Sequence, residues 1–73
     1  MAYKLQTLIF LRNQWSLRQA KEYLASHHYK TDVDIKAHSY RFRQRQPKKG
    51  AEYKTLLKHV NGKVVYYVFI VSP

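Results

Sequence analysis

The dipeptide Asn61-Gly62 constrains the fold of this chain more than any other feature of its sequence. It lies between two runs of alternating residues, and Asn-Gly in that position is typical of a two-residue type I′ β-turn. Such a short loop sets the register of the two strands, so Val60 should lie opposite Lys63 and Leu56 opposite Tyr67. We therefore expect a β-hairpin over residues 53–70.

The predicted hairpin has two faces of different character, because successive side chains of a strand point to opposite sides. One face carries four pairs of mostly apolar residues: His59–Val64, Leu57–Tyr66, Thr55–Val68 and Tyr53–Ile70. The other face carries three lysines and two aromatic residues: Lys54, Lys58, Lys63, Tyr67 and Phe69. We expect the first face to point to the core. The second is expected to be a basic surface with aromatic rings set into it.

The first third of the chain predicts a strand followed by a helix. Residues 4–12 alternate and carry large apolar groups on both faces, which is typical of a central strand covered on both sides. Ser16 and Gln19 have the spacing of a capping box, and Trp15 can pack onto Ala20. The helix should run over residues 17–28. Its inner stripe has i, i+3, i+4, i+7 spacing and consists of Ala20, Tyr23, Leu24 and His27.

Residues 32–45 predict extended structure with a change of phase. Val33 and Ile35 are apolar at odd positions, whereas Tyr40 and Phe42 are aromatic at even positions. Such a change indicates either a bulge near His38-Ser39 or two short strands.

An arginine row follows the change of phase. Arg41, Arg43 and Arg45 recur at every second position, so in a strand they share one face, opposite the aromatic rings of Tyr40 and Phe42. Pro47 should end the strand, because proline cannot donate a hydrogen bond to a sheet. Lys48-Lys49-Gly50 is then expected to form a basic turn.

Together these elements predict an α+β fold in one compact basic domain, residues 1–73. The expected sheet has three to four mostly antiparallel strands in the order β-α-β-β-β, with one helix packed on one face.

Net charge indicates the class of partner. Fourteen Lys and Arg residues against four Asp and Glu residues give a net charge of +10. Residues 41–63 hold eight basic residues and one acidic residue, Glu52, so +7 of that charge lies in a third of the chain. A charge of this size opposes folding by self-repulsion and favours polyanionic partners. The alternative is a charge that serves solubility alone.

Other compositional features argue against several functions. The chain has no cysteine, which fits a reducing, intracellular compartment. No signal peptide is expected from its start, and its longest apolar run, residues 64–71, is too short to span a bilayer. The four histidines are not spaced with acids as metal ligands, and no nucleophile motif or glycine-rich phosphate loop is present. We expect no enzyme activity, no cofactor, no metal and no small-molecule substrate.

The leading hypothesis is a nucleic-acid-binding protein that contacts the phosphate backbone with little sequence preference. Arginine and lysine would hold phosphates, and exposed aromatic rings would stack on bases. The expected binding residues are Arg41, Arg43, Arg45, Lys48, Lys49, Lys54, Lys58, Lys63, Tyr67 and Phe69. The alternatives are a minor structural or capsid component that docks on an acidic protein surface, and an inhibitor that mimics a basic ligand. The sequence does not distinguish DNA from RNA, nor does it indicate an oligomeric state.

Part of the chain resembles a small domain of tailed phages and large DNA viruses. The matching motifs cover roughly residues 5–47: Trp15-Ser16, Ala20-Lys21, Tyr23-Leu24, His27, Tyr29-Lys30, Tyr40-Arg41-Phe42-Arg43 and Pro47. The chain departs from the family pattern at Tyr23, where tryptophan is common, and at His28, where glycine is common. The resemblance implies a viral origin, with the protein in the virion or the infected cell, and it assigns no functional residue.

Overall fold

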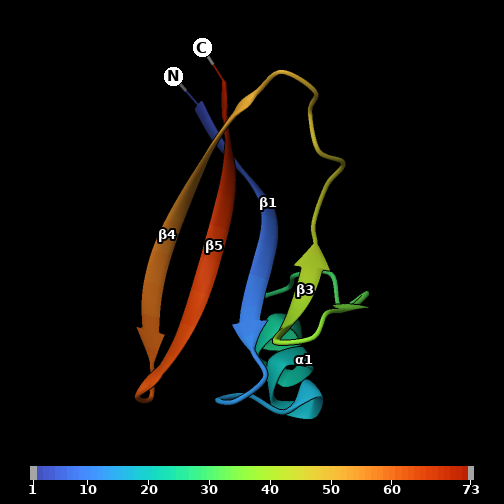
Figure 1. The fold of residues 1–73 in the computed structure, drawn as a ribbon, viewed down its shortest axis with the longest axis vertical. Coiled ribbons are helices and arrows are strands. Elements are labelled where there is room, and N and C mark those ends of the chain that lie inside the picture. Colours follow the sequence, from blue (N-terminus) through green and yellow to red (C-terminus); the bar gives the residue numbers. More distant parts are fainter. Residues whose placement is uncertain (1, 73) are drawn as a thin grey trace.

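A computed structural model describes residues 2–72 as one antiparallel sheet with a single helix (Figure 1). In chain order the elements are β1 (Ala2–Leu11), α1 (Leu17–Ser26), β2 (Asp34–Ile35), β3 (Ser39–Arg43), β4 (Glu52–Val60) and β5 (Lys63–Ser72). The strand order across the sheet is β2-β3-β1-β5-β4. The α+β class is confirmed. The prediction of three to four strands is wrong, because among the described residues the sheet has five.

The hairpin forms as its turn residues predict. Asn61 and Gly62 both have positive φ angles, 50° and 78°, as a type I′ turn requires. Val60 lies opposite Lys63 and Leu56 opposite Tyr67, so the predicted register of β4 and β5 is confirmed.

The face of the hairpin that points to the core was predicted wrongly. Helix α1 packs on the side of Val65 and Tyr67, and Val65 is fully buried in one cluster with Ala20 and Leu24 of the helix. The face with Tyr66 and Leu57 points away from the helix. The prediction failed because both rows mix apolar and polar residues, so alternation alone cannot say which row the helix covers.

Aromatic packing holds the helix against the sheet. Phe10 of β1 is fully buried and makes edge-to-face contacts with Phe42, Trp15 and Tyr23 at centroid distances of 5.4, 4.9 and 5.7 Å. The Trp15 indole also donates a hydrogen bond of 3.0 Å to the carbonyl oxygen of Val64. The segment before the helix is thereby anchored to the start of β5.

Both ends of the helix are capped. The Ser16 hydroxyl accepts from the amide of Gln19 and the Gln19 side chain accepts from the amide of Ser16, so the capping box is confirmed. The helix ends at Ser26, two residues earlier than expected, with His27 as its C-cap. His28 follows with φ of 61°, and the amide of Tyr29 returns to the carbonyl oxygen of Leu24 at 2.9 Å. This arrangement is a Schellman motif.

The inner stripe of the helix is only partly buried. Ala20 and Leu24 are fully buried and Tyr23 is half-buried, whereas His27 is exposed. The His27 ring lies against the ring of Tyr23, with centroids 4.2 Å apart. The stripe is therefore confirmed for its first three members.

Strand β1 is central in the sheet, as expected, but the helix covers only one of its faces. Leu8 on the helix side is fully buried, and Ile9 on the other side is half-buried. A bulge at Gln6, which the sequence did not indicate, interrupts the pairing with β5 between Leu5 and Thr7. The change of phase after Ile35 arises from two short strands, β2 and β3, which was one of the two alternatives.

Candidate nucleic-acid interface

The arginine row lies on the sheet face that points away from α1. Phe42 is fully buried on the helix side, so Arg41 and Arg43 project to the opposite side, and both are exposed. Strand β3 ends at Arg43, earlier than predicted from Pro47. Arg45 therefore lies beyond the strand, and its Nε donates a hydrogen bond of 2.9 Å to the carbonyl oxygen of Leu5. We call Arg41 and Arg43 with the surface around them the arginine face.

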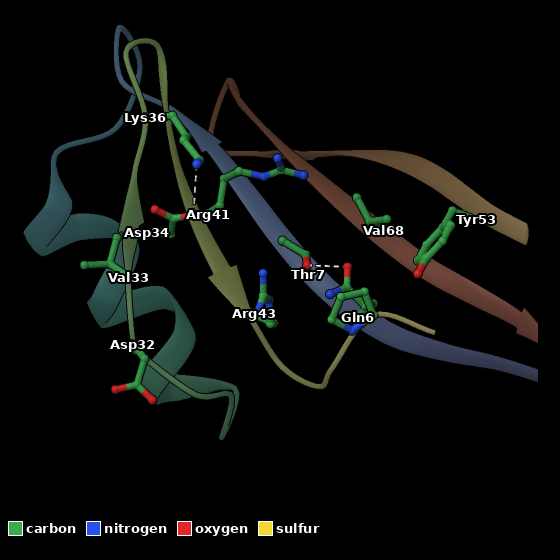
Figure 2. A pocket seen from close by; sticks show the side chains of 11 residues that line it. Gln6, Thr7, Asp32, Val33, Asp34, Lys36, Arg41, Arg43, Tyr53 and Val68 are labelled. Atoms are coloured by element: carbon green, nitrogen blue, oxygen red, sulfur yellow. Dashed lines mark hydrogen bonds and ion pairs between the residues drawn. The ribbon is translucent and has the colours of Figure 1, made fainter. Parts of the chain in front are cut away.

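The arginine face borders an open hollow of about 740 Å³ (Figure 2). Its lining mixes both charge signs, because Asp32 and Asp34 line it together with Lys36 and the two arginines. Lys36 pairs with Asp34 at 3.2 Å. In Figure 2 the side chain of Arg41 extends toward Val68 and away from Asp34. The hollow thus has two carboxylates beside three basic side chains, and one of the carboxylates, Asp34, is paired with Lys36.

The segment between β3 and β4, residues 44–51, carries the next predicted contacts, Lys48 and Lys49. Both lysines are exposed. The bulge in β1 holds the start of this segment, since the carbonyl oxygen of Gln6 accepts from the amide of Gln44 at 2.7 Å. Farther along, the Tyr53 hydroxyl accepts from the amide of Lys48 at 3.0 Å and donates to the carbonyl oxygen of Lys48 at 3.1 Å.

The hairpin lysines lie on the helix side of the sheet, opposite the arginine face. Lys54 Nζ lies 5.7 Å from the centroid of the Tyr3 ring, and Lys58 Nζ lies 5.7 Å from the centroid of the Tyr67 ring. At this distance an ammonium group is attracted to the negative face of an aromatic ring. Both lysines are nevertheless exposed, so their charge remains accessible to a partner.

Lys63 differs from the other two lysines. Its Nζ lies 4.9 Å from the Trp15 ring and donates to Gln19 Oε1 at 3.1 Å. It is half-buried and supports the capped start of the helix. A phosphate that bound Lys63 would therefore have to compete with the contacts that its ammonium group makes to Trp15 and Gln19.

Three aromatic rings form a row beside these lysines. Tyr3 and Phe69 meet edge to face at 6.4 Å, and Phe69 and Tyr67 stack at 6.3 Å. Helix α1 lies at one end of the sheet and the two chain ends lie at the other (Figure 1). In the β1–β5 ladder, Phe69 and Tyr3 lie nearer the chain ends than Tyr67 does. Tyr3 is 52% exposed, and Phe69 is half-buried. We call Tyr3, Lys54, Lys58, Tyr67 and Phe69 the lysine–aromatic surface.

Tyr3 was not among the predicted residues. Its pairing with Val71 across the β1–β5 ladder places it next to Phe69, and neither the register nor the bulge that sets it could be read from the sequence. Tyr67, by contrast, was predicted to stack on bases, but its hydroxyl bonds that of Tyr23 and its ring packs against the core. Burial and this hydrogen bond raise the pKa of Tyr67 above its ordinary range.

The predicted contacts thus fall on two opposite faces and one connecting segment. The arginine face holds Arg41 and Arg43, the helix side holds Lys54, Lys58, Lys63, Tyr67 and Phe69, and the segment after β3 holds Arg45, Lys48 and Lys49. The arginine row and the hairpin lysines do not form one continuous surface.

Comparison of the chain with protein-family models, with curated proteins and with solved structures finds no match. Within residues 2–72, no three His, Asp or Glu side chains are grouped closely enough to hold a metal ion. Over the same residues, no helix has the length and apolar character needed to cross a membrane.

Proposed function

We propose that this protein binds nucleic acid through phosphate contacts and base stacking, with little sequence preference, and that the lysine–aromatic surface is the primary contact. One observation carries the proposal: exposed ammonium groups of Lys54 and Lys58 lie over a row of aromatic rings whose outer members, Tyr3 and Phe69, are not covered by the helix. Proteins that bind single strands without sequence preference combine these two elements, a cationic groove and rings on which bases stack.

The distribution of charge supports the same proposal. Among residues 2–72 the structure holds two ion pairs, Arg18–Glu22 and Lys36–Asp34, and neither involves the lysine–aromatic surface. The arginine face carries two guanidinium groups, but Asp32 and Asp34 lie beside it. One carboxylate, Glu52, shares the strand face of Lys54 and Lys58, whereas two lie beside the arginine face, so a polyphosphate is repelled less on the helix side.

The test is the salt dependence of binding to a single-stranded oligonucleotide. Each phosphate contact on a single strand contributes roughly −0.7 to the slope of log affinity against log salt. The double variant Lys54→Gln/Lys58→Gln should therefore flatten the slope by about 1.4 units. Replacing Tyr3 by leucine should weaken binding by about 1–3 kcal/mol with an unchanged slope, because it removes a stacking ring and no charge.

The matched control is Arg41→Gln/Arg43→Gln, which removes the same charge from the opposite face. If this variant flattens the slope and the lysine variant does not, the contact surface is the arginine face. If the intact protein binds neither single strands nor duplexes at low salt, the nucleic-acid proposal is wrong. Circular dichroism of each variant checks that the fold is retained.

A second candidate is a structural role in which the protein docks on an acidic protein surface. The arginine face favours it, because Arg41 and Arg43 adjoin the half-buried apolar side chains of Ile9 and Val68 on the sheet face that the helix does not cover. Arginine beside apolar residues is typical of protein interfaces. The viral origin implied by the sequence resemblance remains a prediction, compatible with either role.

A further inference from the structure

The two edges of the sheet differ in their capacity to pair with another strand. Strand β2 is two residues long, and its Asp34 forms an ion pair with Lys36. Strand β4 at the other edge has nine residues and pairs regularly along its length with β5. Short, charged edges resist pairing with another chain, whereas long, regular edges invite it.

The free backbone groups of β4 belong to alternate residues. Val60 and Lys63 close the two-residue turn as a hydrogen-bonded pair, so the even-numbered residues of β4 bond β5. The amide and carbonyl groups of Tyr53, Thr55, Leu57 and His59 therefore point outward from the sheet. None of these four side chains is an acid, a lysine, an arginine or a proline.

The lysines of β4 do not guard this edge. Lys54 and Lys58 belong to the set that bonds β5, and both ammonium groups lie over rings on the helix side, at 5.7 Å from Tyr3 and from Tyr67. Large apolar side chains are exposed along the strand instead: Tyr53 is 44%, Leu56 49% and Leu57 49% exposed.

We propose that β4 pairs antiparallel with β4 of a second copy of this chain, centred on Thr55. In this register Glu52, the acidic residue of the hairpin, lies opposite Lys58 of the second copy. By symmetry, Lys58 of the first copy also lies opposite Glu52 of the second. On the other face Tyr53 lies opposite Leu57 of the second copy, which covers both exposed side chains. Thr55 lies opposite itself and exchanges backbone hydrogen bonds.

The charged side chains of β4 favour this register over registers whose centre is shifted by one or two residues. A register centred on Leu56 places Lys54 opposite Lys58 of the second copy, and one centred on Lys54 places two copies of that lysine together. Like charges directly opposite each other destabilise a strand pair. A register centred on Leu57 avoids these contacts but leaves Glu52 without a lysine partner. Charge complementarity therefore selects Thr55 as the centre.

The symmetry axis of such a pair runs perpendicular to the sheet, so both helices lie on the same side of a continuous ten-stranded sheet. The lysine–aromatic surfaces of the two copies then face the same way. The dimer proposal is independent of the nucleic-acid proposal, and its tests use the protein alone, without nucleic acid.

The first test is a single-cysteine scan, which is clean because the chain has no native cysteine. Hydrogen-bonded antiparallel pairs have Cα atoms about 5.5 Å apart, within disulfide range. Under mild oxidation Thr55→Cys should form a covalent dimer readily, and Leu57→Cys should not. Equal cross-linking at the two positions, or cross-linking at residue 57 alone, overturns the register.

The second test is a charge exchange followed by analytical ultracentrifugation at sub-millimolar protein and near-physiological salt, where long-range repulsion between the cationic copies is screened. Glu52→Lys and Lys58→Glu should each shift the sedimenting species toward monomer, and the double variant should restore the dimer. Within one chain these positions are roughly 20 Å apart, so rescue requires contact between copies. An intact protein that remains monomeric overturns the proposal.

A proline variant separates pairing from folding. Thr55→Pro removes an outward-pointing amide, which an edge strand tolerates, so it should abolish the dimer while circular dichroism stays unchanged. Thr55→Val, which retains the amide, should remain dimeric. A dimer that survives Thr55→Pro is not formed through β4.

Discussion

At the scale of single residues, His28 carries a conformational cost that the fold does not need. It occupies the left-handed position after the helix, with φ of 61°. A side chain in that region costs roughly 1–2 kcal/mol, a cost that glycine avoids. We expect His28→Gly to raise the free energy of unfolding by about 1 kcal/mol, measured by urea denaturation. His27→Gly is the control: its φ is −102°, so it should not stabilise the protein.

The hydroxyl pair of Tyr23 and Tyr67 predicts a loss of stability at alkaline pH. Burial and the hydrogen bond raise the pKa of Tyr67 in the folded state, so the folded chain keeps this proton after the unfolded chain releases it. The contribution of Tyr67 to the free energy of unfolding is therefore complete below about pH 10, and it decreases as the pH rises above that value. The slope of unfolding free energy against pH above about 10 should be shallower in Tyr67→Phe. Tyr66→Phe serves as the control, and an equal change in both variants contradicts this account.

At the scale of elements, the helix should depend on its buried face more than on its exposed one. Leu24 is fully buried against the sheet, so Leu24→Ala should cost about 2–5 kcal/mol and lower the melting temperature sharply. Lys21→Ala on the exposed face should change stability by less than about 0.5 kcal/mol. Similar effects of the two changes would show that the helix does not pack as described.

The cap at the start of the helix is a separate element-scale prediction. The Ser16 hydroxyl accepts from the amide of Gln19 at 3.1 Å. Ser16→Ala should lose about 0.5–2 kcal/mol and speed hydrogen exchange at that amide, whereas Ser16→Asp should retain most of the stability. If the hydrogen-exchange rate of the Gln19 amide is the same in Ser16→Ala as in the original protein, Ser16 does not cap the helix.

Local signals predicted the elements well and their assembly poorly. The turn at Asn61-Gly62 and the capping box at Ser16 depend on a few neighbouring residues, so the sequence contains all that determines them. The buried face of the hairpin depends on where the helix packs. The ammonium groups of Lys54 and Lys58 lie over the rings of Tyr3 and Tyr67, and the alternation of residues does not show these contacts. The candidate site was divided between two faces for the same reason, and Tyr3 joined it through a pairing between the two ends of the chain.

At the scale of the whole molecule, self-repulsion should make stability depend on salt. The 73 residues carry a net charge of +10, and within residues 2–72 the structure has two ion pairs, so most basic side chains repel one another without an acidic partner. Added salt shortens the range of this repulsion to about 10 Å at 0.1 M and about 3 Å at 1 M. The melting temperature should therefore rise with sodium chloride, as followed by circular dichroism, and it should rise less in Lys48→Gln/Lys49→Gln. A melting temperature that is independent of salt would mean that repulsion does not limit stability.

The strand order also determines when the protein can fold. The central pair of the sheet joins β1 to β5, the first and last strands, with Ala2 opposite Ser72. Val65 of β5 completes the cluster that α1 packs into, and Tyr67 packs against it, so residues 2–62 lack part of their core. We therefore expect residues 2–62 to reach full stability on the ribosome only after β5 has emerged. Pairing of β5 with β1 closes a loop nearly as long as the chain, which predicts a slow folder for its size.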